Sequence, residues 1–402
     1  MSRMAIVDER LCNPLPIAEL ERRWMAVRSA MGAAGLDALV VQGANNMSGT
    51  GGYFRWFTGI SAPSSYSQTL IFPREGLSTL VAHGPFSGES THDGTDPALP
   101  GIGRRLSTSA FPAVGYTAAY EPDIAVQEIK KAGYRAVGLV GSTSAYHGFA
   151  QRLKDGLAGI RLVDSTDLID PIRAVKSPEE IELIRRAAEM QDEIFRKVRD
   201  HIRPGLKDFE VMAYAQYVGQ TLGSETGYFI GSSAPAGQPA GVRLRPQQGR
   251  EIKKGDVLFW QAENTGPGGY FVHLARFFVL GRAPQELTDA FAAVRDAQAF
   301  TVERLKPGVS CQALFEDYNG YMRGRGFPPE TRLHCHSQGY DAVERPLIRH
   351  DETMTIGPNM NIGIHPSIGT ARVFATICDN FLTHPDGSVE RLHKTPPEIV
   401  EL

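Results

Sequence analysis

The sequence lacks the features that mark several common classes of protein. Its four cysteines are widely scattered, without the paired spacing of zinc ribbons or redox motifs, which is typical of a reducing compartment. No run approaches the roughly 18 apolar residues of a membrane helix, and the segment MSRMAIVDERLCNPLP lacks the apolar core of a signal peptide. A formal net charge of -3 provides no basic excess for nucleic acid. We therefore expect a cytoplasmic protein that binds neither nucleic acid nor membrane.

The chain is long enough for two or three domains, since 402 residues exceed the size at which single cores stop growing. Apolar residues recur at helical spacing over residues 16–34, Gly35 is a stop signal, and the apolar run 36–42 is typical of a buried strand. Helical and strand-like segments alternate up to about Asp170. Residues 1–170 are therefore predicted to form an N-terminal α/β domain.

A second domain is predicted over residues 171–402. Ser177 precedes Pro178, and Glu180 lies three residues after Ser177, which is the pattern of a capping box at the start of a long helix. A second helix is expected to begin near Lys207. Residues 229–242 are rich in glycine, serine and proline and predict a loop.

Residues 255–281, GDVLFWQAENTGPGGYFVHLARFFVLG, predict a β-hairpin in which two apolar runs flank a glycine-rich connection. Polar residues interrupt both runs: Gln261 and Glu263 in the first, His273 and Arg276 in the second. Polar side chains that point inward from core strands are typical of a functional site.

Six landmarks follow one another along the chain: IRAVKSPEEIELIRRA, KKGDVL, GGYFVHLARFF, LKPGVS, HSQG and CDNFLTHPDG. In this order they resemble the creatinase and aminopeptidase P family. The resemblance implies an α+β protein with a C-terminal pita-bread domain, an antiparallel sheet covered by helices, and a smaller α/β N-terminal domain. It also implies a homodimer in which one subunit's N-terminal domain closes over the other's active site.

The peptidases of that family hold two metal ions with two aspartates, a histidine and two glutamates. The resemblance places Gln261, His273, His336, His365 and Cys378 at these five positions, so that only the histidine is retained. Two divalent ions about 3.5 to 4 Å apart need several anionic oxygens to offset their repulsion. The standard two-metal site is therefore not expected.

Two alternatives remain open for the three histidines. Three neutral imidazoles can hold one Zn, Fe, Mn or Cu ion, with Cys378 or Gln261 completing the shell. Alternatively, the pocket is metal-free, and His336 and His365 form an acid–base pair with His273 as a third site residue. Glu344 is a candidate general base or a structural partner of Arg345 and Arg349.

Several residues are candidates for substrate binding. Arg243 and Arg245 flank Leu244, where the family has a histidine, and are either a carboxylate clamp or part of a solvated loop. The resemblance places Tyr66 near a substrate-binding arginine of the N-terminal domain. Arg55, in the aromatic segment YFRWFT, either contacts substrate or a second subunit, or extends from an aromatic half-core into solvent.

The sequence thus predicts a creatinase-like small-molecule hydrolase. Its expected substrate is a polar, carboxylate-bearing metabolite with a C–N bond of amide, amidine or lactam type. Creatine itself is not expected, because Ala275 and Val343 replace a glutamate and a histidine of creatinase. The alternatives are a lyase on the same fold, and an inactive member that only binds or regulates.

Overall fold

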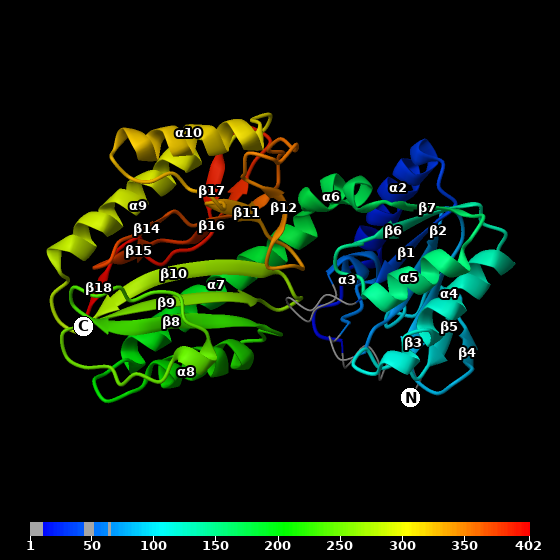
Figure 1. Cartoon of the computed structure of the whole chain (residues 1–402), viewed down its shortest axis with the longest axis horizontal. Coiled ribbons are helices and arrows are strands. Elements are labelled where there is room, and N and C mark those ends of the chain that lie inside the picture. Colours follow the sequence, from blue (N-terminus) through cyan, green and yellow to red (C-terminus); the bar gives the residue numbers. More distant parts are fainter. Residues whose placement is uncertain (1–10, 44–51, 63–65) are drawn as a thin grey trace. The chain divides into compact units, whose positions relative to one another are not determined.

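The computed structural model describes residues 11–43, 52–62 and 66–402, and the chain divides into two compact units, Met1–Arg173 and Ala174–Leu402 (Figure 1). Each unit has its own sheets and helices. None of the described helices is both long enough and apolar enough to cross a membrane.

The first unit is built on a seven-stranded sheet with the strand order β4-β5-β3-β2-β1-β6-β7. The central strand β1 pairs antiparallel with β2 and parallel with β6, and all five of its residues are buried. Both faces of the sheet are therefore covered. The strands are β1 (Ala38–Gln42), β2 (Thr69–Pro73), β3 (Ser78–His83), β4 (Gly88–Thr91), β5 (Ile102–Thr108), β6 (Ala136–Val140) and β7 (Arg161–Asp164).

Helices cover this sheet as the sequence pattern predicts. The helix expected over residues 16–34 is α2, and Gly35 ends it in the left-handed conformation with φ of 62°. Such a φ disfavours residues with a side chain, so Gly35 is required where the chain turns toward β1. The helices of the unit are α2 (Ile17–Ala34), α3 (Gly52–Thr58), α4 (Tyr120–Lys131), α5 (His147–Gly156) and α6 (Thr166–Ala174).

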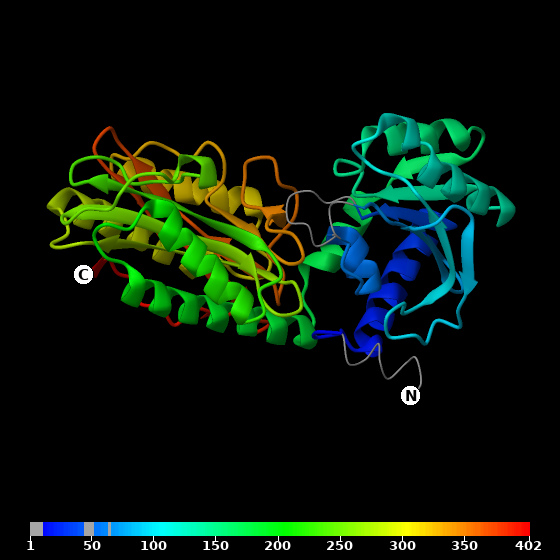
Figure 2. The same ribbon diagram turned by 90° about the horizontal axis from the view of Figure 1, so that it is seen from below.

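The second unit begins with the predicted capping box. The Ser177 hydroxyl accepts a hydrogen bond from the Glu180 N–H, and the Glu180 carboxylate accepts one from the Ser177 N–H. Because these bonds satisfy free N–H groups of the first turn, helix α7 (Pro178–His201) starts at Pro178. The second expected helix is α8 (Asp208–Thr221). Both helices lie across one face of the sheet that contains β8 (Gly227–Pro235), β9 (Asp256–Thr265) and β10 (Phe271–Val279) (Figure 2).

The predicted hairpin is confirmed as β9 (Asp256–Thr265) and β10 (Phe271–Val279), which pair antiparallel. Alternate residues face opposite sides. One set, which includes Trp260 and Leu274, packs against α7 and α8; the other, which includes Phe259 and Phe277, packs against helix α9 (Gln285–Arg304). Further along this second face the apolar residues give way to Gln261, Glu263 and His273.

The loop predicted over residues 229–242 is wrong for its first half, because strand β8 (Gly227–Pro235) pairs with β9 over its whole length. Its glycines reflect close packing. A Cβ atom at Gly231 would lie 2.0 Å from the Phe259 carbonyl oxygen, and φ there is 148°. Glycine is therefore required by contact with the neighbouring strand.

The rest of the second unit supplies another wall of the site. A five-stranded sheet has the order β12-β11-β13-β16-β17, and β18 joins β10 at the edge of the first sheet. These remaining elements are α10 (Cys311–Gly324), β11 (Cys335–Ser337), β12 (Glu344–Leu347), β13 (Asn361–Ile364), β14 (Ser367–Gly369), β15 (Phe374–Thr376), β16 (Asp379–Thr383), β17 (Val389–Arg391) and β18 (Val400–Glu401).

Candidate active site

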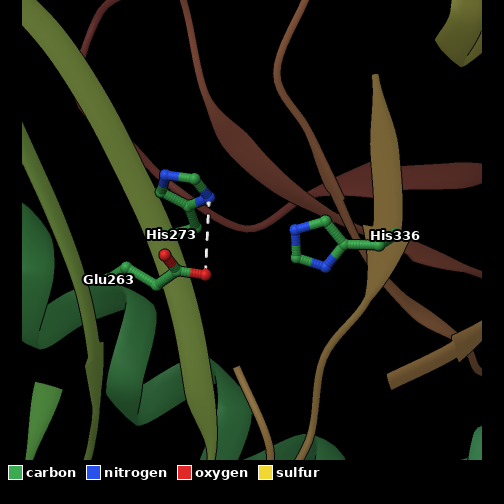
Figure 3. Close-up of side chains that lie close together, drawn as sticks. All are labelled: Glu263, His273 and His336. Carbon is green, nitrogen blue, oxygen red and sulfur yellow. Dashed lines mark ion pairs between the residues drawn. The ribbon is translucent and has the colours of Figure 1, made fainter. Parts of the chain in front are cut away.

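Three side chains from three strands converge in the second unit: Glu263 of β9, His273 of β10 and His336 of β11 (Figure 3). Glu263 and His273 are direct cross-strand partners. One potential ligand atom from each residue lies within 4.8 Å of the other two, and His273 Nδ1 lies 3.9 Å from Glu263 Oε1. The cluster therefore combines two imidazoles with one carboxylate.

His365 places a third imidazole beside this cluster. It follows β13, and its N–H donates a 2.8 Å hydrogen bond to the carbonyl of His334, which fixes its backbone beside β11. Its ring centroid lies 5.0 Å from that of His336 and 5.6 Å from that of His273. The structure thus brings together all three histidines singled out by the sequence.

Burial keeps these histidines neutral. It lowers the pKa of His336 to about 4, with Arg332 acting in the same direction. The pKa values of His273 and His365 lie well below 6.5, because both rings are buried near other imidazoles and Arg332. Since His336 Nδ1 lies 3.0 Å from the Ser337 carbonyl oxygen, which can only accept, Nδ1 carries the proton and Nε2 has a free lone pair.

Glu263 is the functional candidate that the sequence analysis noted but did not select. Burial raises its pKa to about 7, while Arg332 and a hydrogen bond from Gln338 oppose that shift. Glu263 lies two residues after Gln261, so both belong to the same face of β9. The alternation of side chains along β9 could have indicated Glu263 as a site residue. Only the position of β11 shows that Glu263 lies beside His336.

A buried network of amides supports the cluster from behind. Gln338 Nε2 donates to Glu263 Oε1 at 3.1 Å, and Asn380 Nδ2 donates to Gln338 Oε1 at 2.8 Å. Asn380 Oδ1 in turn accepts a 2.6 Å hydrogen bond from the N–H of His273. The carboxylate of Glu263 and the backbone of His273 are therefore held by the same short chain of hydrogen bonds.

Gln261 and Cys378 have different surroundings. Gln261 is 8% exposed on the site face of β9. Cys378 is fully buried in the apolar cluster that contains Phe259 and Phe277, and burial raises the pKa of its thiol well above 9. The group of potential metal ligands among the described residues contains Glu263 and does not contain Cys378.

Glu344 lies in a buried ion pair, with Oε2 2.8 Å from Lys176 Nζ, and both side chains are at most 3% exposed. Its other oxygen accepts from the N–H of Asp341 at 3.1 Å. The two arginines expected as its partners contact other acids: Arg345 pairs with Glu352, and Arg349 pairs with Asp351. A general-base role for Glu344 stays a prediction.

This ion pair provides a test of the two roles considered for Glu344. Glu344→Gln should reduce the free energy of unfolding by about 1.5 to 3 kcal/mol, the usual size of a lost hydrogen bond to a charged group. Urea denaturation measures this change. The double variant Lys176→Met/Glu344→Leu should lose less stability than the sum of the losses in the two single variants. The reason is that the double variant leaves no unpaired charge in the protein interior. Unchanged stability with a large loss of turnover would contradict the structural role.

Two of the candidate substrate residues, Arg243 and Arg245, belong to the second unit, and the other two, Tyr66 and Arg55, belong to the first. Arg245 stacks over the ring of Phe209 at 4.2 Å, and Arg243 is exposed, with Nη1 3.2 Å from the Val242 carbonyl oxygen. In the first unit, Tyr66 stacks against His83 at 4.3 Å, and Arg55 is only 6% exposed, so it does not extend into solvent as one interpretation expected. Binding of substrate by any of the four stays a prediction.

Arg332 is a cation that the sequence analysis did not select. Four residues before His336, it is exposed, and its guanidinium makes no hydrogen bond or ion pair with any residue the structure describes. Its charge nevertheless acts on the site. It opposes the rise in the pKa of Glu263 that burial causes, and it contributes to the lowered pKa values of the three site histidines. A positive charge therefore lies near the imidazole cluster.

Comparison with known proteins identifies both units. Residues 182–385 match Metallopeptidase family M24, and residues 23–175 match the Creatinase/Prolidase N-terminal domain. An Xaa-Pro dipeptidase of Pyrococcus horikoshii is 26% identical over 324 residues, which cover 73% of this chain and 86% of the relative. An uncharacterized hydrolase/peptidase of Sinorhizobium fredii is 25% identical over 407 residues, which cover 96% of this chain and 97% of the relative.

Solved structures confirm the fold expected from the sequence. An X-Pro aminopeptidase from Thermotoga maritima has a TM-score of 0.76 at 17% identity, over 94% of this chain and 99% of that chain. A prolidase from Pyrococcus horikoshii has a TM-score of 0.73 at 21% identity, over 94% of this chain and all of that chain. The α+β architecture is thus the pita-bread fold with its smaller N-terminal domain.

Proposed function

The chain belongs to metallopeptidase family M24, and we propose that it is a hydrolase that cleaves a C–N bond in a small polar molecule, not a two-metal peptidase. The observation that carries this proposal is the composition of the site. Glu263 is the only carboxylate that joins His273 and His336 in the ligand group of the described residues. One carboxylate cannot offset the repulsion of two divalent ions, so the family's usual pair of ions does not fit these residues.

The imidazoles suit hydrolysis of an amide, amidine or lactam. His365 is half-buried, and its pKa well below 6.5 keeps the ring neutral at pH 7. Its Nε2 has no hydrogen-bond partner among the described residues. As a general base, His365 takes a proton from water while the water oxygen bonds to the electrophilic carbon. It then returns the proton to the nitrogen as the C–N bond breaks, so that protons balance.

A carboxylate on the substrate is part of the proposal, supported by the unpaired charge of Arg332. A guanidinium pairs with a carboxylate through two parallel hydrogen bonds. Such a pair orients the substrate beside the imidazoles. Arg243 and Arg245 are the alternative residues for binding this carboxylate. We also propose that the protein is a cytoplasmic homodimer and that Tyr66 and Arg55 contribute to substrate binding.

Substrate screening tests this function. Purified protein is incubated with amides, amidines and lactams, each with and without a carboxylate, beside a panel of Xaa-Pro dipeptides. We expect turnover of a carboxylate-bearing member in the first set and none of the dipeptides. Product from ¹⁸O-labelled water should contain the label; unlabelled product would indicate a lyase. Rapid cleavage of Xaa-Pro dipeptides would refute the proposal, and binding without turnover would indicate an inactive member.

If Arg332 binds the substrate carboxylate, its removal should change KM and leave kcat nearly unchanged. Arg332→Ala should raise KM for the carboxylate-bearing substrate about 10- to 100-fold, the equivalent of about 1.5 to 3 kcal/mol, with kcat little changed. Steady-state kinetics measures both constants. The matched control is Arg282→Ala, since Arg282 has a side chain 94% exposed and pairs with Glu401. If Arg243→Ala or Arg245→Ala raises KM instead, the carboxylate site belongs to those residues.

A further inference from the structure

We propose that Glu263, His273 and His336 bind one divalent transition-metal ion, a mononuclear centre with Glu263 as its only carboxylate. This goes beyond the proposed hydrolysis, because it concerns ion binding and not the substrate. It also differs from the ligand set expected from the sequence, which included Cys378 and not Glu263. The spacing of the three side chains, the unpartnered ring nitrogens of His273 and the charge of Glu263 support this site.

The three side chains lie close enough together to bind one metal ion after a small inward movement of their ligand atoms. Their potential ligand atoms lie within 4.8 Å of one another, and His273 Nδ1 lies 3.9 Å from Glu263 Oε1 (Figure 3). Ligands about 2.0 to 2.2 Å from a tetrahedral ion lie about 3.3 to 3.6 Å apart. Small side-chain rotations on three fixed strands therefore close the shell.

The imidazoles present free lone pairs in a buried place. Both ring nitrogens of His273 lack a hydrogen-bond partner among the described residues, although the side chain is only 8% exposed. An unsatisfied buried polar group is destabilising, and a bound ion would satisfy it. His336 donates from Nδ1 to the Ser337 carbonyl and leaves Nε2 unprotonated, which is the arrangement that orients metal-binding histidines.

Charge also favours a cation. Glu263 has a side chain 15% exposed, and its only ion-pair contact with a described residue is the 3.9 Å approach of His273. No described lysine or arginine forms an ion pair with it. Gln338 Nε2 donates to Glu263 Oε1 at 3.1 Å and leaves the other carboxylate oxygen available as a ligand. A divalent ion would supply the direct ion-pair partner that none of the described lysines or arginines provides.

The ligand types indicate which ions fit. Two imidazoles and one carboxylate suit Zn²⁺, Fe²⁺ or Mn²⁺, and three protein ligands leave a position for water or substrate. His365, whose ring lies 5.0 Å from His336, stays free for proton transfer. Cys378 lies outside this ligand group, and its fully buried side chain belongs to the apolar cluster that contains Phe259 and Phe277.

Metal binding can be measured without any substrate. Full-length protein is stripped with a chelator, checked for its fold by circular dichroism, and titrated with Zn²⁺ by calorimetry; metal content after dialysis is measured by mass spectrometry. We expect one ion per chain. Glu263→Gln, which preserves size, and His273→Ala should each weaken Zn²⁺ binding at least 10-fold.

Cys378→Ser is the matched control, since it alters the thiol expected from the sequence. It should still bind one ion, and the Co²⁺-loaded wild-type protein should show no thiolate charge-transfer band. Two ions per chain, no ion, or unchanged affinity in folded Glu263→Gln would each overturn the proposal. Loss of binding in Cys378→Ser with retention in Glu263→Gln would assign the ion to the cysteine. None of these outcomes depends on whether the protein hydrolyses a C–N bond.

Discussion

Replacing His365 with alanine should lower kcat about 10² to 10⁴-fold, the usual contribution of a positioned general acid–base group. The reason is its geometry: the ring lies 5.0 Å from His336 and 5.6 Å from His273, and Nε2 has no partner among the described residues. KM should change little, because substrate binding is assigned to Arg332. Steady-state kinetics on the substrate found by screening measures the separation.

Chemical rescue distinguishes proton transfer from a structural effect. Added imidazole should restore part of the activity of His365→Ala, because a free base can enter the space that the side chain leaves. His350→Ala, which removes an exposed imidazole, is the control and should retain wild-type rates. Wild-type turnover in folded His365→Ala would remove His365 from the mechanism.

The second large effect concerns stability. Asp379→Ala should reduce the free energy of unfolding by about 3 to 5 kcal/mol, because it leaves Arg276 as an uncompensated buried charge. Both side chains are 0% exposed, and Arg276 Nη2 lies 2.7 Å from Asp379 Oδ1. Arg391 also approaches this carboxylate, at 3.0 Å. Denaturation in urea at pH 7 measures the change.

The same ion pair predicts a direction for the pH dependence. Burial alone would raise the pKa of Asp379, but Arg276, His393 and Arg391 lower it below its usual value of 3.8. A folded-state pKa below the unfolded one means that the carboxylate stabilises the protein above about pH 4. That contribution is lost as the pH falls through the folded-state pKa. The free energies of unfolding of wild type and Asp379→Ala should therefore become more similar in acid.

An exposed pair provides the control for this comparison. Arg186 and Glu182 are 52% and 56% exposed and lie one helical turn apart on α7. Glu182→Ala should therefore change stability by less than about 1 kcal/mol. Equal effects of Asp379→Ala and Glu182→Ala would contradict the importance of burial.

Local signals in the sequence were sufficient for most of the elements that position the site. The capping box at Ser177 and Glu180 predicted the start of α7, since it depends only on residues three apart. The glycine-rich connection and its flanking apolar runs predicted the β9–β10 hairpin. Strand β8 was missed because Gly231 reflects contact with Phe259, which lies 28 residues away and gives no local signal.

The candidate site also has features that the sequence predicted and features that only the structure revealed. The sequence by itself determined the fold family, because its motifs follow one another in the family's order. The exchange of metal-binding carboxylates for Gln261, His273, His365 and Cys378 stays a prediction. Only the tertiary structure decided that Glu263 meets His273 and His336, that Cys378 is buried in an apolar cluster, and that Glu344 pairs with Lys176. The physical reason is that β9, β10 and β11 bring together residues up to 73 positions apart, and the burial that sets their charge exists only after those strands have packed.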